Sequence, residues 1–109
     1  MSIRVEPADV PDLIAGRWGY LVVTGARPSD APRALAVRPR VDDGVVRVEV
    51  GTGSVAALLT GGAGVSLVIV PDGSGDLGAY SLIVDGSATV HDGAAEFAPT
   101  GAVWHRPAP

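Results

Sequence analysis

The segment GTGSVA at residues 51–56 has the spacing G-x-G-x-x-A, which is typical of a turn that holds a pyrophosphate at the start of a helix. Asp72 lies 21 positions beyond Gly51, where such sites carry the acidic residue that binds a ribose hydroxyl. The helix predicted after this turn is only about two turns long, and no second strand–helix–strand unit follows. A dinucleotide site would also need parallel pairing of Val45–Val50 with Val65–Val70. We keep it as an alternative that this pairing would decide.

The same residues could bind an anion outside that fold. Thr52, Gly53 and Ser54 place hydroxyls and backbone N–H groups at a predicted helix start, where the helix dipole favours negative charge. Arg38 and Arg40 share parity on the preceding predicted strand, so they should face the same side and could hold a phosphate. In the alternative reading, Ser54 only caps the helix and the arginines only pair with surface carboxylates.

Aromatic residues are few, and they offer flat surfaces for a ring. Trp18, Tyr20, Tyr80 and Trp104 are four of the five aromatics, beside a single Phe. Tryptophan and tyrosine can stack on a planar ligand, but more often they anchor a core or an interface. The sequence alone leaves both roles open.

Metal and triad chemistry have little support. His91 and His105 are the only imidazoles, and they lack a third ligand at metal spacing, so no metal site is predicted. Ser81, Asp85 and His91 could be combined into a catalytic triad, but no G-x-S-x-G motif is present.

Composition limits the remaining possibilities. The 109 residues are 47% apolar and 18% charged, which favours one folded domain over residues 1–109. With no Cys, disulfides and thiol catalysis are excluded, and the net charge of -4 argues against nucleic acid as a partner. The N-terminus lacks the apolar region of a signal peptide, and no apolar run could span a membrane, so we expect a cytoplasmic protein without membrane contact.

Short β-rich segments separated by turns must position these side chains. Asp42–Gly44 and Asp92–Gly93 are hairpin signals, and Gly86 predicts a bulge. Pro39 predicts an edge strand, a bulge or a strand end. Val46, Val48 and Val50 should share one face, whereas Val65–Val70 is apolar enough for burial on both. The predicted strands are Trp18–Thr24, Arg33–Val41, Val45–Val50, Val65–Val70, Tyr80–Val90 and a broken strand over Glu96–His105; the predicted helices are Val10–Ala15, capped by Asp9, and Val55–Thr60.

The order of the predicted strands and turns resembles that of the pyridoxamine 5'-phosphate oxidase-like FMN-binding split-barrel proteins. The resemblance is carried by three segments in this order: WGYLVVT, AVRPRVDDGVVRVEVGTGSVAALLTGGAGVSLVIVP and YSLIVDGSATV. The chain is similar in particular to the short actinobacterial members, which end in a segment like AVWHRPAP. The resemblance covers roughly residues 15–107, leaving residues 1–16 as an N-terminal arm with a short helix and residues 106–109 as a tail.

The resemblance implies an all-β fold: a six-stranded antiparallel Greek-key split barrel that forms a homodimer, with FMN sites in the subunit interface. It places the flavin phosphate against the strand carrying Arg38 and Arg40 and against Gly51–Ser54. It places the flavin ring against strand backbone and the partner's C-terminal region, which here contains Trp104 and His105. A small flavin-dependent oxidoreductase of unspecified substrate is the implied activity.

One departure from the family pattern concerns Gly51–Ser54 and the helix after it. Cofactor-binding members usually carry Arg or Lys there, whereas this chain has Thr52, Ser54 and Val55. A phosphate would then depend on hydroxyls, the helix end and the two arginines. The deazaflavin F420 ranks below FMN because its acidic tail needs a basic groove. The alternative is a cofactor-free split barrel that binds another small ligand or a protein partner.

Overall fold

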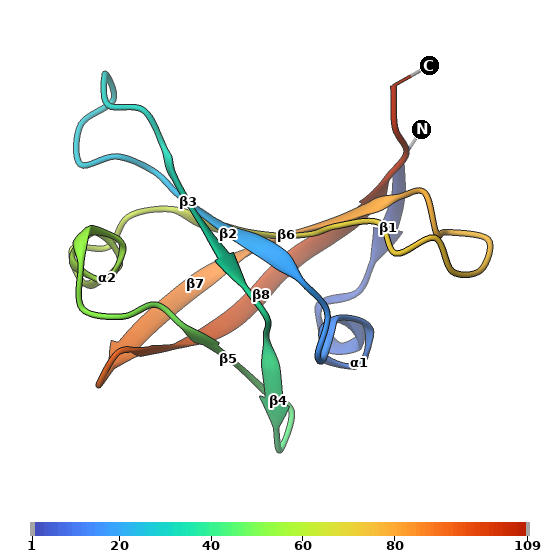
Figure 1. Ribbon diagram of the computed structural model, residues 1–109, viewed down its shortest axis with the longest axis horizontal. Coiled ribbons are helices and arrows are strands. Elements are labelled where there is room, and N and C mark those ends of the chain that lie inside the picture. Colours follow the sequence, from blue (N-terminus) through green and yellow to red (C-terminus); the bar gives the residue numbers. More distant parts are fainter. Residues whose placement is uncertain (1, 109) are drawn as a thin grey trace.

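β-strands with alternating burial dominate the computed structural model, which describes residues 2–108. All strand pairs are antiparallel and belong to one sheet, with two short α-helices beside it (Figure 1). The predicted all-β class with two short helices is therefore confirmed. The strands are β1 (Ser2–Val5), β2 (Gly19–Val23), β3 (Arg33–Val37), β4 (Arg40–Asp42), β5 (Val45–Glu49), β6 (Val65–Ile69), β7 (Ser81–His91) and β8 (Ala94–His105); the helices are η1 (Pro7–Asp9, a 3-10 turn), α1 (Val10–Ile14) and α2 (Ser54–Thr60).

The strand order explains why the sheet curls. Its order is β3-β2-β6-β7-β8-β5-β4, with β1 added to the C-terminal half of β8. Strands β3 and β4 lie at opposite ends of this order, yet only Arg38 and Pro39 separate them along the chain. The two ends of the sheet must therefore meet at these residues, which we call the seam. Figure 1 shows the resulting curled sheet, with β3 running into β4.

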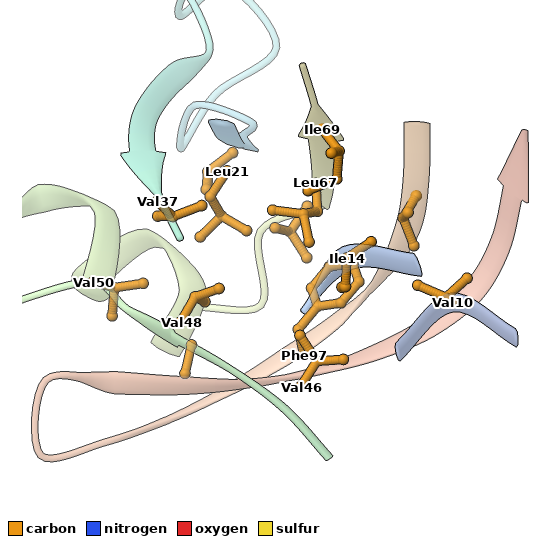
Figure 2. Packing of buried hydrophobic residues seen from close by; sticks show 14 of the residues in the cluster. Val10, Ile14, Leu21, Val37, Val46, Val48, Val50, Leu67, Ile69 and Phe97 are labelled. Carbon is orange, nitrogen blue, oxygen red and sulfur yellow. The ribbon is translucent and has the colours of Figure 1, made fainter. Parts of the chain in front are cut away.

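The inner face of the curled sheet holds the core. Val46, Val48 and Val50 all face inward and are buried, as their alternation predicts. Helix α1 adds Val10 and Ile14, both fully buried, and Figure 2 shows these side chains converging with those of the sheet. Burying such side chains stabilises the fold by about 1.5–3 kcal/mol each. The other largest fully buried side chains are Leu21, Val23, Pro39, Leu67, Ile69, Leu82 and Val84.

Two tight turns and one bulge shape the sheet, as the sequence predicts. Asp43 and Gly44 have φ of 51° and 77°, and Asp92 and Gly93 have 51° and 80°, the left-handed pairs of type I′ hairpins. The register shifts beside Gly86, because Asp85 lies opposite Gly101 while Gly86 lies opposite Pro99. The extra residue is therefore on β8. The bulge lets two long strands bend together around the core.

The structure corrects several expectations about the strands. Residues 2–108 contain eight strands rather than six, because β1 was not predicted and Pro39 divides Arg33–Val41 into β3 and β4. Strand β8 is continuous across the segment predicted to be broken. Strand β6 is buried on one face only, since Ser66 and Val68 remain half-buried on the other.

The helix starts also differ in detail from their predictions. The N-cap of α2 is Gly53 and Ser54 is its first residue, so Ser54 does not cap the helix. Asp9 does occupy the N-cap position of α1, but its side chain makes no capping hydrogen bond. Over residues 2–108, no helix combines the length and the apolar character that crossing a bilayer requires.

Candidate functional site

Arg38, at the seam, is the predicted phosphate ligand whose position is most clearly fixed. Its Nε donates a hydrogen bond of 2.7 Å to the carbonyl oxygen of Gly16, and its guanidinium lies 5.6 Å from the centre of the Trp18 ring. The remaining N–H groups of Arg38 have no described hydrogen bond in residues 2–108. The side chain is exposed, so this held guanidinium can still donate to an oxyanion.

Arg40, two residues on, contacts a different element. Its Nη2 lies 3.4 Å from a carboxylate oxygen of Glu49 on β5, and both side chains are largely exposed. Arg38 instead contacts Gly16 and Trp18, because buried Pro39 ends β3 between the two arginines. A surface ion pair like that of Arg40 is worth little in water, so its guanidinium can be recruited by a phosphate at small cost.

The residues at the start of α2 are exposed and carry no charge. Thr52, Gly53 and Ser54 lie on the surface, and the described hydrogen bonds of residues 2–108 include none from the two hydroxyls. Helix α2 has seven residues and no acidic residue in its first turn. The structure describes no hydrogen bond or ion pair between this segment and Arg38 or Arg40 within residues 2–108. The two predicted parts of a phosphate site, the 52–54 segment and the two arginines, therefore have no described polar contact with each other within residues 2–108.

The two tryptophans have opposite environments. Trp104, the predicted ring neighbour, is 8% exposed and belongs to the core, where it pairs with Leu82 of β7 and Ile3 of β1. One side of it borders a hollow of about 490 Å³. Trp18 is 59% exposed, the most exposed large hydrophobic residue in the described part of the chain. Trp18 is thus the aromatic surface that stands beside a predicted phosphate ligand.

Asp72, the acidic residue of the dinucleotide pattern, lies far from the glycine segment and contacts other residues. Figure 1 shows α2 and the loop after β6 at opposite ends of the molecule. The backbone N–H and the hydroxyl of Ser74 bond to the carboxylate of Asp72, with Arg17 nearby, and lower the pKa of Asp72 below its usual value. Strand β5 pairs with β4 and β8, and β6 pairs with β2 and β7. The parallel pairing that a dinucleotide site needs is absent from residues 2–108.

Comparison with known proteins places this fold. No protein-family model and no curated protein sequence matches the chain. Two solved structures are similar over nearly the whole length. An FAD binding protein from Mycobacterium smegmatis has a TM-score of 0.61 at 18% identity, covering 97% of this chain and 100% of that one. A "putative pyridoxamine 5'-phosphate oxidase" from Corynebacterium glutamicum has a TM-score of 0.55 at 18% identity, covering 99% and 96%. The chain has a split-barrel fold of the pyridoxamine 5'-phosphate oxidase-like kind.

In this split barrel, the other candidate chemistry does not assemble. Ser81 and His91 are the first and last residues of β7, so they cannot form a triad with Asp85. His105 is paired with Ser81 at the far end of β8. No group of three metal-ligating side chains occurs among residues 2–108.

The outer face of the split barrel carries a row of apolar residues that the sequence analysis did not single out. Tyr20 lies opposite Ala36 on β3 and Val68 on β6, Val68 opposite Ile83 on β7, and Ile83 opposite Val103 on β8. We call these five residues the outer row. Tyr20 is 47% exposed and the three β-branched members are half-buried. The register that joins them depends on pairing between distant strands, which local patterns do not reveal.

Proposed function

We propose that this split barrel binds FMN and acts as a small flavin-dependent oxidoreductase. The phosphate is held by Arg38 and Arg40, with the hydroxyls and backbone of Thr52, Gly53 and Ser54 as further donors, and the ring lies near Trp104 of the partner subunit. The observation that carries the proposal is Arg38: an exposed guanidinium fixed at the seam by Gly16, whose other N–H groups have no described hydrogen bond within residues 2–108. The fold similarity to a protein described as FAD-binding supports the choice of a flavin.

The residues present fit a phosphate better than a longer acidic chain. A single phosphate needs a few donors, which a guanidinium fork supplies in pairs. All eight basic residues of this chain are Arg, and none lies in residues 51–60. F420, with its acidic tail, would need a more basic groove and ranks lower. When bound, the flavin would supply the electron or hydride transfer, and the chain would hold and orient it.

We also propose that the protein is a homodimer that buries the outer row. Tyr20 and its neighbours form a continuous apolar surface across five strands, and a twofold axis through it would bring the same surface of each subunit together. A stable interface of this kind covers about 800 Å² per partner. Arg4 and Asp85 flank the row and supply opposite charges at its rim.

The test is to titrate the purified protein with FMN and to measure the melting temperature and the flavin fluorescence at each FMN concentration. We expect dissociation constants in roughly the micromolar range and a raised melting temperature, since ligand at 100 times its dissociation constant stabilises by about 2.7 kcal/mol. Arg38→Gln should weaken binding at least about tenfold, because charged hydrogen bonds to the phosphate are lost. Arg33→Gln is the matched control, since Arg33 is also exposed and its described side-chain hydrogen bond within residues 2–108 is to the carbonyl of Ala31, two residues away.

Reduction of bound FMN by a nicotinamide cofactor would then test the oxidoreductase activity. No flavin binding to the wild-type protein at hundreds of micromolar FMN would contradict the proposal. The cofactor-free barrel would then be the better description, and the missing basic residue beside Ser54 its physical reason.

A further inference from the structure

Trp18 borders a hollow that no predicted phosphate ligand lines. The hollow has a volume of about 370 Å³ and lies where the chain enters β2 and leaves β6. The backbone N–H of Val70 donates to the carbonyl of Trp18 at 3.2 Å, so the two walls are tied together. We call this feature the Trp18 hollow. Its lining residues are Gly16, Arg17, Trp18, Val70, Pro71 and Asp72.

The indole of Trp18 is preorganised as a flat wall of this hollow. Arg38 lies over the ring, and its Nε donates to the carbonyl of Gly16, another lining residue of the hollow. Leaving 59% of a tryptophan side chain in water forgoes favourable burial, which a stacked ligand ring would recover. Fixing the wall before binding lowers the entropic cost of association.

Arg17 and Asp72 place a donor beside an acceptor in the hollow. One Nη of Arg17 donates to the Val70 carbonyl at 2.9 Å, and the same nitrogen lies 3.5 Å from Oδ2 of Asp72. That separation exceeds a short charged hydrogen bond of about 2.8 Å, so the pair is loose. Arginine has five N–H donors, which leaves others available to a ligand.

The two oxygens of Asp72 differ in their contacts. Oδ1 accepts from the backbone N–H of Ser74 at 2.9 Å and from its hydroxyl at 2.7 Å. Among the described hydrogen bonds and ion pairs of residues 2–108, Oδ2 has only the loose contact with Arg17. Because the pKa of Asp72 is lowered by Ser74, the carboxylate stays ionised and acts only as an acceptor. Oδ2 can therefore receive a proton donor from a ligand.

We propose that the Trp18 hollow binds a planar heteroaromatic ring that carries an N–H donor beside a carbonyl acceptor on one edge. The ring stacks on Trp18, its carbonyl accepts from Arg17, and its N–H donates to Asp72 Oδ2. The pyrimidine edge of a flavin, the carboxamide of nicotinamide and the edge of guanine all have this chemistry. The flavin case rests on the proposed function; the other two do not.

The test uses ligands without phosphate, so that Arg38 chemistry does not contribute. Riboflavin, nicotinamide and guanosine are titrated against Trp104→Phe protein, in which Trp18 is the sole tryptophan and its fluorescence reports stacking. If that variant does not fold, calorimetry with the wild-type protein replaces the fluorescence. We expect at least one of the three to bind and to quench Trp18.

Three changes then test the recognition. Asp72→Asn should weaken binding about tenfold or more, because the ligand N–H loses its charged acceptor. Asp76→Asn, an exposed carboxylate of the same loop, is the matched control and should leave affinity unchanged. For a flavin ligand, riboflavin methylated at N3 keeps the ring but lacks the N–H, and should also bind about tenfold more weakly. Trp18→Ala should abolish stacking, as calorimetry would show.

The outcomes separate this proposal from the flavin proposal. If FMN binds but Trp18→Ala and Asp72→Asn bind it as tightly as the wild type, and nicotinamide and guanosine do not bind, the hollow is not a ring site and only the flavin proposal stands. If flavins do not bind but nicotinamide or guanosine quenches Trp18 with the expected dependence on Asp72, the hollow is a ring site and the flavin proposal fails. If none of the three binds at millimolar concentration, the ring site is overturned.

Discussion

The guanidinium of Arg38 lies 5.6 Å from the centre of the Trp18 ring, although the two residues are 20 positions apart, one just before β2 and the other just after β3. The hydrogen bond from Arg38 to the Gly16 carbonyl fixes this arrangement at 2.7 Å. Three features of the molecule meet here: the seam of the split barrel, the predicted phosphate ligand and the most exposed aromatic side chain. This contact therefore links the phosphate proposal to the Trp18 hollow.

Arg38→Gln should reduce stability modestly as well as weaken flavin binding. It removes one hydrogen bond to a carbonyl and one exposed cation–π contact, so we expect about 1–2 kcal/mol less free energy of unfolding. Urea unfolding of the ligand-free protein would measure this as a lower midpoint with unchanged slope. Arg33→Gln should stay within about 0.5 kcal/mol of the wild type. Equal stability of the two variants would argue that the Arg38 contacts do not persist in solution.

Local signals in the sequence predicted the turns and the inner face well. The Asp43–Gly44 and Asp92–Gly93 pairs need positive φ at both positions, and few other residue pairs accept that geometry. The alternating valines of β5 can bury only one face. Such features depend on residues that are close along the chain, so the sequence carries them directly.

Features that depend on distant partners were not predictable in the same way. Strand β1 is four residues long and contains Arg4, and it forms because β8 offers an edge about 100 residues later. Trp18 and Trp104 both lie beside or in β-strands, yet tertiary packing buries one and exposes the other. Arg17 and Asp72 meet across 55 positions. For the candidate site, the sequence identified Arg38 and Trp18 separately, but it did not reveal that they lie together.

Gly86→Ala should destabilise the split barrel, whereas Gly101→Ala should not. A Cβ at Gly86 would collide with the carbonyl oxygen of Ala98 and with the Phe97 ring, 2.7 Å from its Cζ. Overpacking of this kind costs about 1–3 kcal/mol. A Cβ at Gly101, on the neighbouring strand β8, would meet no heavy atom within 4 Å. Thermal unfolding followed by circular dichroism would compare the two variants, and equal melting temperatures would contradict the bulge geometry.

Ile83→Glu should convert the proposed dimer into a monomer without unfolding it. Ile83 lies in the middle of the outer row, half-buried, between Val68 and Val103. A carboxylate there would be desolvated without a partner in a dimer but would remain hydrated in a monomer. Light scattering after size-exclusion chromatography would give the molecular mass of each. Ser87→Glu, an exposed position on the same strand, is the matched control. A wild-type protein that is monomeric at millimolar concentration would contradict the dimer itself.

Asp72 should make part of the stability depend on acid pH. The Ser74 backbone N–H and hydroxyl, and then Arg17, favour the ionised carboxylate and lower its pKa in the folded state. A lowered folded-state pKa gives stability that is complete above the ordinary aspartate value of about 3.9 and is lost as pH falls through the lowered value. The melting temperature of the wild type should therefore fall towards that of Asp72→Asn as the pH falls below about 3.9.

The control for this titration is Asp76→Asn, which removes one charge from the same loop without touching Ser74 or Arg17. It reports how much of the acid dependence comes from net charge alone. As the pH falls, the difference in melting temperature between the wild type and Asp72→Asn should shrink more than the difference between the wild type and Asp76→Asn. If the melting temperatures of both variants change with pH as that of the wild type does, the Ser74 hydrogen bonds do not make stability depend on pH. Asp72 would then lack the fixed, ionised geometry on which its role as an acceptor in the Trp18 hollow depends.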